Sequence, residues 1–79
     1  MNPEQRQAHQ YIAQARSALF HNNRSTARQL VQRACALAPD SEEAWLLLAE
    51  ISSPRASLNY LTRALEINPH SQPARRVAD

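Results

Sequence analysis

The side chains that could bind a metal or transfer a proton are few in this chain of 79 residues, and they are scattered. The three histidines, His9, His21 and His70, lie far apart in the sequence. No two of them have the short spacing that places two metal ligands on one helix or loop. The sequence therefore favours surface histidines over a metal site.

The single cysteine, Cys35, is the only candidate nucleophile of the thiol class. It has no histidine near it in the sequence, and it follows Ala34 on a segment that should pack as a helix. A buried structural thiol is therefore favoured over a reactive one. One cysteine also excludes an internal disulfide and a multi-cysteine metal site, so we expect a reducing, cytoplasmic setting.

The carboxylates do not form a catalytic pair either. Glu42 and Glu43 fall where a helix should start, and negative charge is favourable in a first helical turn. This leaves Glu50 and Glu66 as unpaired candidates for acid–base chemistry. The chain has no glycine, which excludes phosphate loops and dinucleotide fingerprints that depend on it. We expect a protein that is not an enzyme and that has no cofactor.

The basic residues are nine arginines and no lysine, and the formal net charge is +2. The segment up to Ala38 is basic, the segment 39–53 is acidic, and the remainder is basic again. Arg24, Arg28 and Arg33 lie on one expected helix, so an alternative function is a small Arg-rich helical protein that binds nucleic acid through a basic face. Aromatic residues do not alternate with these arginines, and no recognition motif is present. A solvated helix face is the favoured interpretation.

Four apolar stripes of helical period place these residues on an all-α framework. The stripes predict helices near 4–20, 24–38, 41–52 and 54–67, with a further helix from about residue 71. Residues that favour helix ends lie at the boundaries: Asn2-Pro3, Asn22-Asn23, a capping-box variant at Asp40-Ser-Glu-Glu43, and Ser53-Pro54. The longest apolar run, Ala44–Ala49, is far shorter than a membrane span, and the first residues show no secretion signal.

The same stripes predict the core. One set of apolar residues comes from the second half of the chain and faces a set from the helix near 24–38. The predicted core residues are Trp45, Leu48, Leu61, Ala64 and Leu65, with Ala27, Leu30, Val31 and Ala34 across from them.

The order of these residues resembles the tetratricopeptide repeat (TPR). Trp45-x-x-Leu48-Ala49, then Ser57-x-x-x-Leu61, then Ala64 to Pro69 follow the W-x2-L-G-x2-Y, A-x3-F, P pattern. Ala49 replaces the glycine of that pattern, Ser52 replaces its tyrosine, and the unit is four residues shorter than the family's repeat. The missing residues fall between Ile51 and Pro54, which predicts a shortened turn between the helices.

A first copy of the pattern precedes this one and has the full length of the family's repeat, with Tyr11 in the place that Trp45 takes in the second copy. Gln14 is polar where an apolar residue is expected, which suits an uncovered end of the stack. The resemblance implies one TPR-like domain over residues 1–79, an α-solenoid of tandem helix-turn-helix hairpins. Repeat 1 covers about 8–41, repeat 2 about 42–71, and residues 72–79 form a C-terminal capping or truncated helix.

The resemblance also implies a function: a non-enzymatic protein–protein interaction module, expected to be the N-terminal scaffold part of a larger protein. The first helix of each hairpin would line a groove for a partner peptide or helix, or for a second copy of the chain in a homodimer. Carried over, the partner-binding residues are His9, Ile12, Ala13, Arg16, Leu19, Phe20, Glu43, Leu46, Leu47 and Glu50.

The family's clamp for C-terminal carboxylates uses Lys and Asn at several of these places, where this chain has Ile12, Ala13, Leu46, Leu47 and Glu50, so the clamp is not expected. An apolar strip that carries Arg16 and Glu50 remains, and it suits an amphipathic helix. The alternative is that Leu46 and Leu47 pack as core beneath the C-terminal helix. Nucleic acid and membrane are disfavoured as partners.

Overall fold

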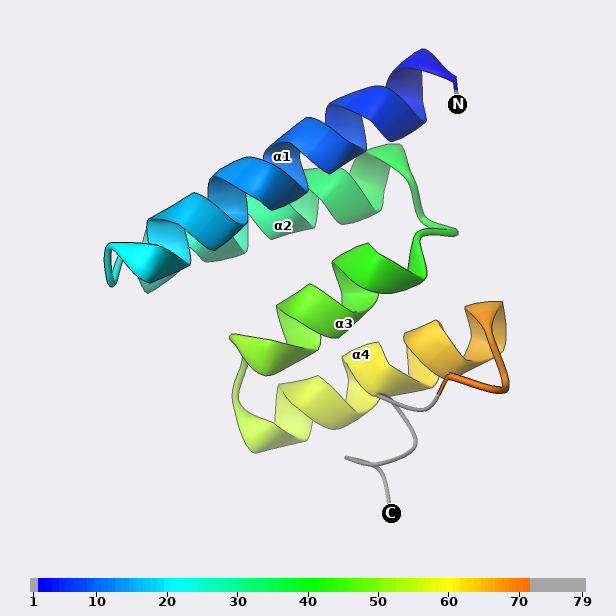
Figure 1. Cartoon of the computed structure of the whole chain (residues 1–79). Coiled ribbons are helices and arrows are strands. Elements are labelled where there is room, and N and C mark those ends of the chain that lie inside the picture. Colours follow the sequence, from blue (N-terminus) through cyan, green and yellow to red (C-terminus); the bar gives the residue numbers. More distant parts are fainter. Residues whose placement is uncertain (1, 72–79) are drawn as a thin grey trace.

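The computed structural model describes residues 2–71, which fold into four α-helices joined by short connections (Figure 1). The helices are α1 (Pro3–Phe20), α2 (Arg24–Leu37), α3 (Glu42–Glu50) and α4 (Pro54–Ile67). α1 pairs with α2 and α3 with α4 as two antiparallel hairpins, and α3 also packs against α2 and α1. No strand occurs among the described residues. The all-α hairpin fold expected from the sequence is confirmed, whereas the expected helix over 72–79 lies outside the described residues.

Side chains satisfy the free N–H groups at the helix starts, as the sequence predicts. Asn2 and Gln5 form a complete capping box at α1, with the Gln5 N–H donating to Asn2 Oδ1 at 2.8 Å. Asn22 has a positive φ of 60°, and Asn23 begins α2 by accepting the Thr26 N–H. Asparagine tolerates the left-handed conformation better than other residues with a Cβ. These two neighbours therefore end one helix and start the next within a three-residue link.

The start of α3 differs from the prediction. Ser41 is the N-cap and accepts the N–H of Ala44, but Ala44 has no polar side chain to return the bond, so the predicted capping-box variant is wrong. The carboxylate of Glu42 instead accepts hydrogen bonds from Asn68 Nδ2 and Ser71 Oγ, both at 2.8 Å. Ser71 is 2 % exposed. Glu42 thus ties the start of α3 to the segment that follows α4.

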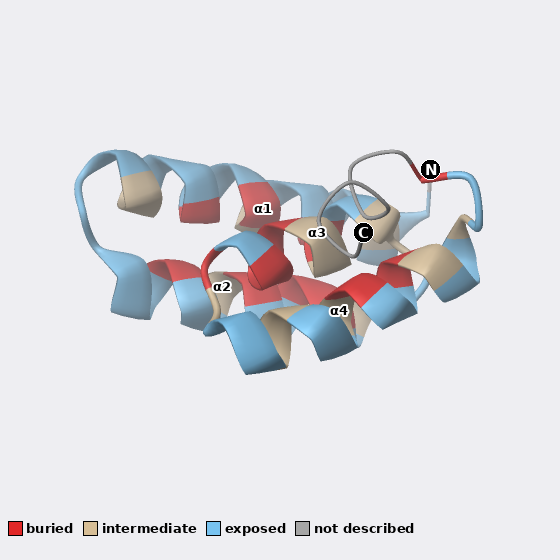
Figure 2. Ribbon diagram, turned by 90° about the horizontal axis from the view of Figure 1, so that it is seen from below, coloured by how far each residue is buried: buried red, intermediate tan, exposed pale blue. Residues whose placement is uncertain are grey.

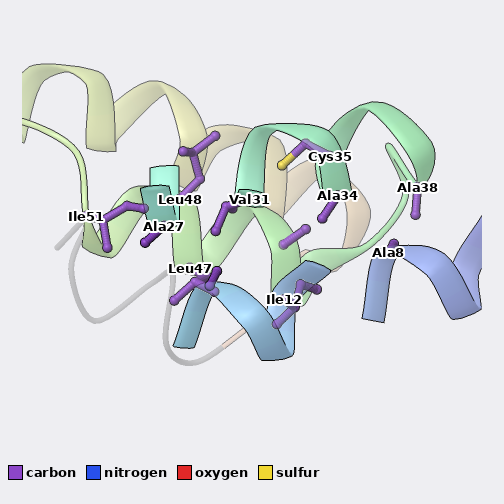
Figure 3. Close-up of a cluster of buried hydrophobic side chains, with 12 residues drawn as sticks. Ala8, Ile12, Ala27, Val31, Ala34, Cys35, Ala38, Leu47, Leu48 and Ile51 are labelled. Carbon is purple, nitrogen blue, oxygen red and sulfur yellow. The ribbon is translucent and has the colours of Figure 1, made fainter. Parts of the chain in front are cut away.

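The core forms two clusters on the inward faces of the helices (Figure 2). The larger one gathers residues from α1, α2 and α3; Figure 3 shows Ile12, Val31 and Leu47 within it. The smaller one contains Ala49, Leu61 and Ala64. The predicted core is buried at six positions, Ala27, Val31, Ala34, Leu48, Leu61 and Ala64, and half-buried at Leu30, Trp45 and Leu65.

Trp45 connects these clusters. Its ring packs against both and stacks on Tyr60 with ring centroids 6.0 Å apart. Its indole N–H donates to the Pro39 carbonyl oxygen at 2.8 Å. A large aromatic ring whose polar atom has a partner can lie at a cluster boundary without an unsatisfied donor. Trp45 therefore joins the two hairpins while remaining partly exposed.

The four residues missing from the second hairpin are taken from a helix, and the predicted shortened turn is wrong. The links within the two hairpins, residues 21–23 and 51–53, have the same length. α3 ends at Glu50, which corresponds to Arg16 of α1, whereas α1 continues for four more residues, to Phe20. The last turn of α1, up to Phe20, consequently has no counterpart, and α1 and α2 extend beyond the end of α3 (Figure 1).

Candidate functional site

The first helices of the two hairpins, α1 and α3, share a partly exposed face that a side-chain pair crosses. Arg16 Nη2 of α1 donates to Glu43 Oε1 of α3 at 3.4 Å. Their side chains keep 57 % and 46 % of their accessible surface. Pairs as exposed as this contribute roughly 0–1 kcal/mol to stability. The structure thus brings together two predicted site residues and leaves both accessible from outside.

Two of the predicted groove residues are not on this face. Ile12 and Leu47 keep only 3 % and 2 % of their surface and belong to the larger core cluster. They are buried because α3 packs against both α1 and α2, so that apolar residues on its inner side meet the first hairpin. The prediction that these two side chains are open to a partner is wrong. Their contribution is to stability.

His9, Ala13 and Phe20 are exposed along α1. Phe20 keeps 86 % of its surface because the turn that carries it extends beyond α3, and its ring meets the His21 ring edge-on at 5.4 Å. Leu19, on the same turn, is half-buried against the larger cluster. An aromatic ring as exposed as Phe20 loses much of its contact with water when a partner covers it. We name the exposed set His9, Ala13, Arg16, Phe20 and Glu43 the α1–α3 face.

Leu46 and Glu50, the remaining predicted residues, line a different hollow. It has a volume of about 520 Å³ and lies between α3 and α4, with mostly apolar walls. Its other lining residues are Ala49, Ser52, Pro54, Ser57 and Leu61. We name it the α3–α4 pocket. The wall that α4 adds to this pocket was not predicted, because the predicted groove used only the first helix of each hairpin. A signal for it was present in the sequence, since Ser57 takes the place in the second copy that Ala27 takes in the first.

Residues 2–71 offer no cluster of side chains suited to holding a metal ion, which would need a group of three or more His, Cys, Asp or Glu side chains. Cys35 is buried, and desolvation raises the pKa of its thiol to about 11 from an ordinary value of 9.0. The thiol is therefore protonated near neutral pH, which makes it a poor nucleophile. This agrees with the structural thiol favoured by the sequence.

Two of the three arginines on α2 contribute to another hollow, of about 580 Å³, between α2 and the α3–α4 link. Arg24 and Arg28 line it together with polar side chains and Ile51. Arg28 Nη2 donates to the Ile51 carbonyl oxygen at 3.0 Å, at the C-terminal end of α3. Arg28 thus has a structural partner. Arg33 is not among the lining residues of this hollow.

Comparison with known families identifies the repeat. The family model described as tetratricopeptide repeat matches residues 4–51, more than half of the chain. The chain belongs to the tetratricopeptide repeat family. The match covers the first hairpin and α3, the part in which α3 packs onto α1 and α2. Searches of curated proteins and of solved structures gave no match.

Tetratricopeptide repeats generally mediate protein–protein interactions. In this repeat protein Ala49 occupies the place of the pattern's glycine and is only 5 % exposed, so a methyl group fits between α3 and α4. Within the described part, no helix combines the length and the apolar character needed to cross a membrane.

Proposed function

We propose that this tetratricopeptide repeat protein is a non-enzymatic interaction module of the cytoplasm, which binds a segment of a partner protein across the α1–α3 face. The exposure of Phe20 is the observation that supports this most strongly. An aromatic side chain 86 % exposed on a face that also carries Arg16 and Glu43 gives a partner both an apolar and a charged contact. Interfaces are enriched in aromatic residues and arginine, and a few of them dominate the binding energy.

The charges also support a protein partner over nucleic acid. The Arg16 guanidinium lies beside Glu43, so the face carries charges of both signs. A phosphate backbone would meet a carboxylate there, whereas a peptide can pair with either group. A reducing setting is consistent with the buried, protonated thiol of Cys35.

A comparison of two exposed apolar side chains tests the proposal. Phe20→Ala removes a ring from the α1–α3 face, and Leu58→Ala removes an apolar group 54 % exposed on α4. We expect the full chain to capture one or more proteins from an extract of its source cells, and Phe20→Ala to weaken this capture at least about tenfold, as a hot-spot residue does. Leu58→Ala should leave it unchanged.

Two outcomes would overturn the proposal. One is capture that is equal for the unsubstituted chain and Phe20→Ala. The other is recovery of nucleic acid whose binding falls steeply between low and moderate salt, because phosphate contacts depend on salt in that way. Circular dichroism of both variants should match that of the unsubstituted chain, since neither side chain is buried.

A further inference from the structure

The groove between α1 and α2 is filled by α3, which gives an internal example of what such a groove binds. Four apolar residues of α3 and its end enter the larger cluster, at relative positions 0, +3, +4 and +7: Ala44, Leu47, Leu48 and Ile51. All four are buried. They meet Ile12, Ala15, Ala27 and Val31 of the first hairpin, which are also buried.

The same groove recurs in the second hairpin. α1 and α3 align with Tyr11 matched to Trp45, and α2 and α4 align with Ala34 matched to Ala64. In this alignment the counterparts of Ile12, Ala15, Ala27 and Val31 are Leu46, Ala49, Ser57 and Leu61. All four counterparts line the α3–α4 pocket of about 520 Å³. Leu46 and Ser57 are half-buried, whereas their counterparts in the first hairpin are buried.

A second copy of the chain does not suit this pocket. In a head-to-tail stack, α1 of the second copy would enter the α3–α4 pocket in the way that α3 enters the groove between α1 and α2. The α1 residues that correspond to the four apolar residues of α3 are Gln10, Ala13, Gln14 and Ser17, and all are exposed. Burying two glutamine amides in an apolar pocket without hydrogen-bond partners is unfavourable. The exposed Gln14 also fits the uncovered end that the sequence predicts.

The charge at the rim specifies the occupant further. Arg16 pairs with Glu43, the residue just before the first small residue of α3. The counterpart of Arg16 is Glu50, which lines the α3–α4 pocket and forms no ion pair with residues 2–71. The sign of the charge is therefore reversed at the second groove. Consider a helix that enters the α3–α4 pocket in the way that α3 enters the first groove. Its residue just before the small residue, the position that Glu43 holds in α3, would lie beside the carboxylate of Glu50.

We propose that the α3–α4 pocket binds an amphipathic helix of a partner protein that repeats the apolar spacing of α3. Its sequence has a small residue followed by large aliphatic residues at +3, +4 and +7, with Arg or Lys immediately before the small residue. This recognition uses α4 and does not depend on the proposed role of the α1–α3 face. It is a helix-in-groove interaction in which spacing and charge are both specified.

A peptide made from α3 tests the proposal directly. The probe is residues 41–53 with Glu43→Arg, titrated into the ¹⁵N-labelled full chain. We expect amide shifts that centre on Ala49, Ser57 and Leu61. The unsubstituted peptide should bind about two- to fivefold more weakly, the range expected for one exposed ion pair. In the Glu50→Arg variant this preference should reverse, and in the matched control Glu66→Arg it should stay as in the unsubstituted chain.

Leu46→Asp should abolish binding of the Glu43→Arg peptide, while Leu58→Asp on the exposed side of α4 should not. Glu50→Arg changes only an exposed side chain, so the reversal can be measured even if Leu46→Asp fails to fold. Equal affinity for both peptides, or shifts outside the pocket, would overturn the proposal. Nuclear Overhauser contacts between any of residues 72–79 and Leu46 in the free chain would also overturn it, because the chain's own segment would then fill the pocket. Shifts at the pocket on concentration of the chain alone would mean that a second copy fills it, and the proposal would be overturned in that case as well.

Discussion

Glu42 shows how one side chain can hold a repeat together. Its two carboxylate oxygens accept hydrogen bonds from Asn68 and Ser71, residues 26 and 29 positions away. As a helix-start residue it was recognisable from the sequence, because Ser41 precedes it. Its long-range bonds were not, because they depend on where α4 ends relative to α3. Glu42 thus places a negative charge in the first turn of α3 and also links the start of α3 to the segment after α4.

Glu42→Ala should lower the free energy of unfolding by about 1–3 kcal/mol, since each hydrogen bond to a charged group contributes on that order. Glu43→Ala is the matched change one residue away, and it removes only the exposed pair with Arg16. It should cost under about 1 kcal/mol. Urea unfolding followed by circular dichroism compares the two. Equal losses would mean that the Asn68 and Ser71 bonds add nothing to stability.

Cys35 should make stability depend on pH in the alkaline range. Its pKa is raised from 9.0 to about 11 in the folded chain, so the unfolded chain loses the thiol proton first as pH rises. Stability from this group is complete below pH 9 and declines as the pH approaches 11, by on the order of 2 kcal/mol. Cys35→Ala removes this term. The stability of the two proteins, measured from pH 8 to 11, should converge on the alkaline side, and parallel curves would contradict a shifted thiol.

The helices begin where short-range chemistry places them. The caps Asn2, Asn23, Ser41 and Ser53 act on N–H groups only three residues away, so the sequence locates each helix start to within one residue. The end of α3 is different. A four-residue deletion could be taken from a turn or from a helix with the same sequence evidence. Ile51 follows the last residue of α3 and is buried in the larger cluster. The end of this helix therefore depends on packing between the two hairpins, which the local sequence does not contain.

Leu61 tests the packing of α3 against α4. It is 3 % exposed in the smaller cluster, and large-to-small changes at buried sites cost roughly 2–5 kcal/mol. A domain of this size has about 3–5 kcal/mol available, so Leu61→Ala should leave the chain largely unfolded. Leu58→Ala, on the exposed side of the same helix, should change the melting temperature by little. An unchanged melting temperature for Leu61→Ala would mean that the helix register is wrong.

At the scale of the molecule, the resemblance to a repeat family predicted the order of helices and which of them share a face. It did not predict how deeply each residue lies. Ile12 and Leu47 were assigned to an open groove by position, but α3 lies close enough to α1 and α2 to bury both. Phe20 is exposed for the complementary reason, because α3 ends one turn early. Burial depends on helix length and packing together, and neither follows from the motif.

Self-association is expected when no partner is present. Two repeats bury a small core, the net charge is only +2, and Phe20 is exposed at one end. Analytical ultracentrifugation should show a dimer whose fraction rises with concentration and falls with Phe20→Glu. Leu47→Glu is unsuitable because that side chain is buried and the change would unfold the chain. A monomer at all concentrations would contradict this prediction, because the α1–α3 face would then stay exposed to water without driving association.

Binding through the first helices is best tested by recording which surface a partner touches in the cell. A photo-reactive benzoylphenylalanine placed at Ala13, on the α1–α3 face, is compared with the same residue at Gln29, exposed on α2. Cross-linking of the full chain in its source cells should give a discrete adduct with another protein from position 13 and none from position 29. Adducts from position 29 alone, or the same adducts from both positions, would contradict binding through the first helices.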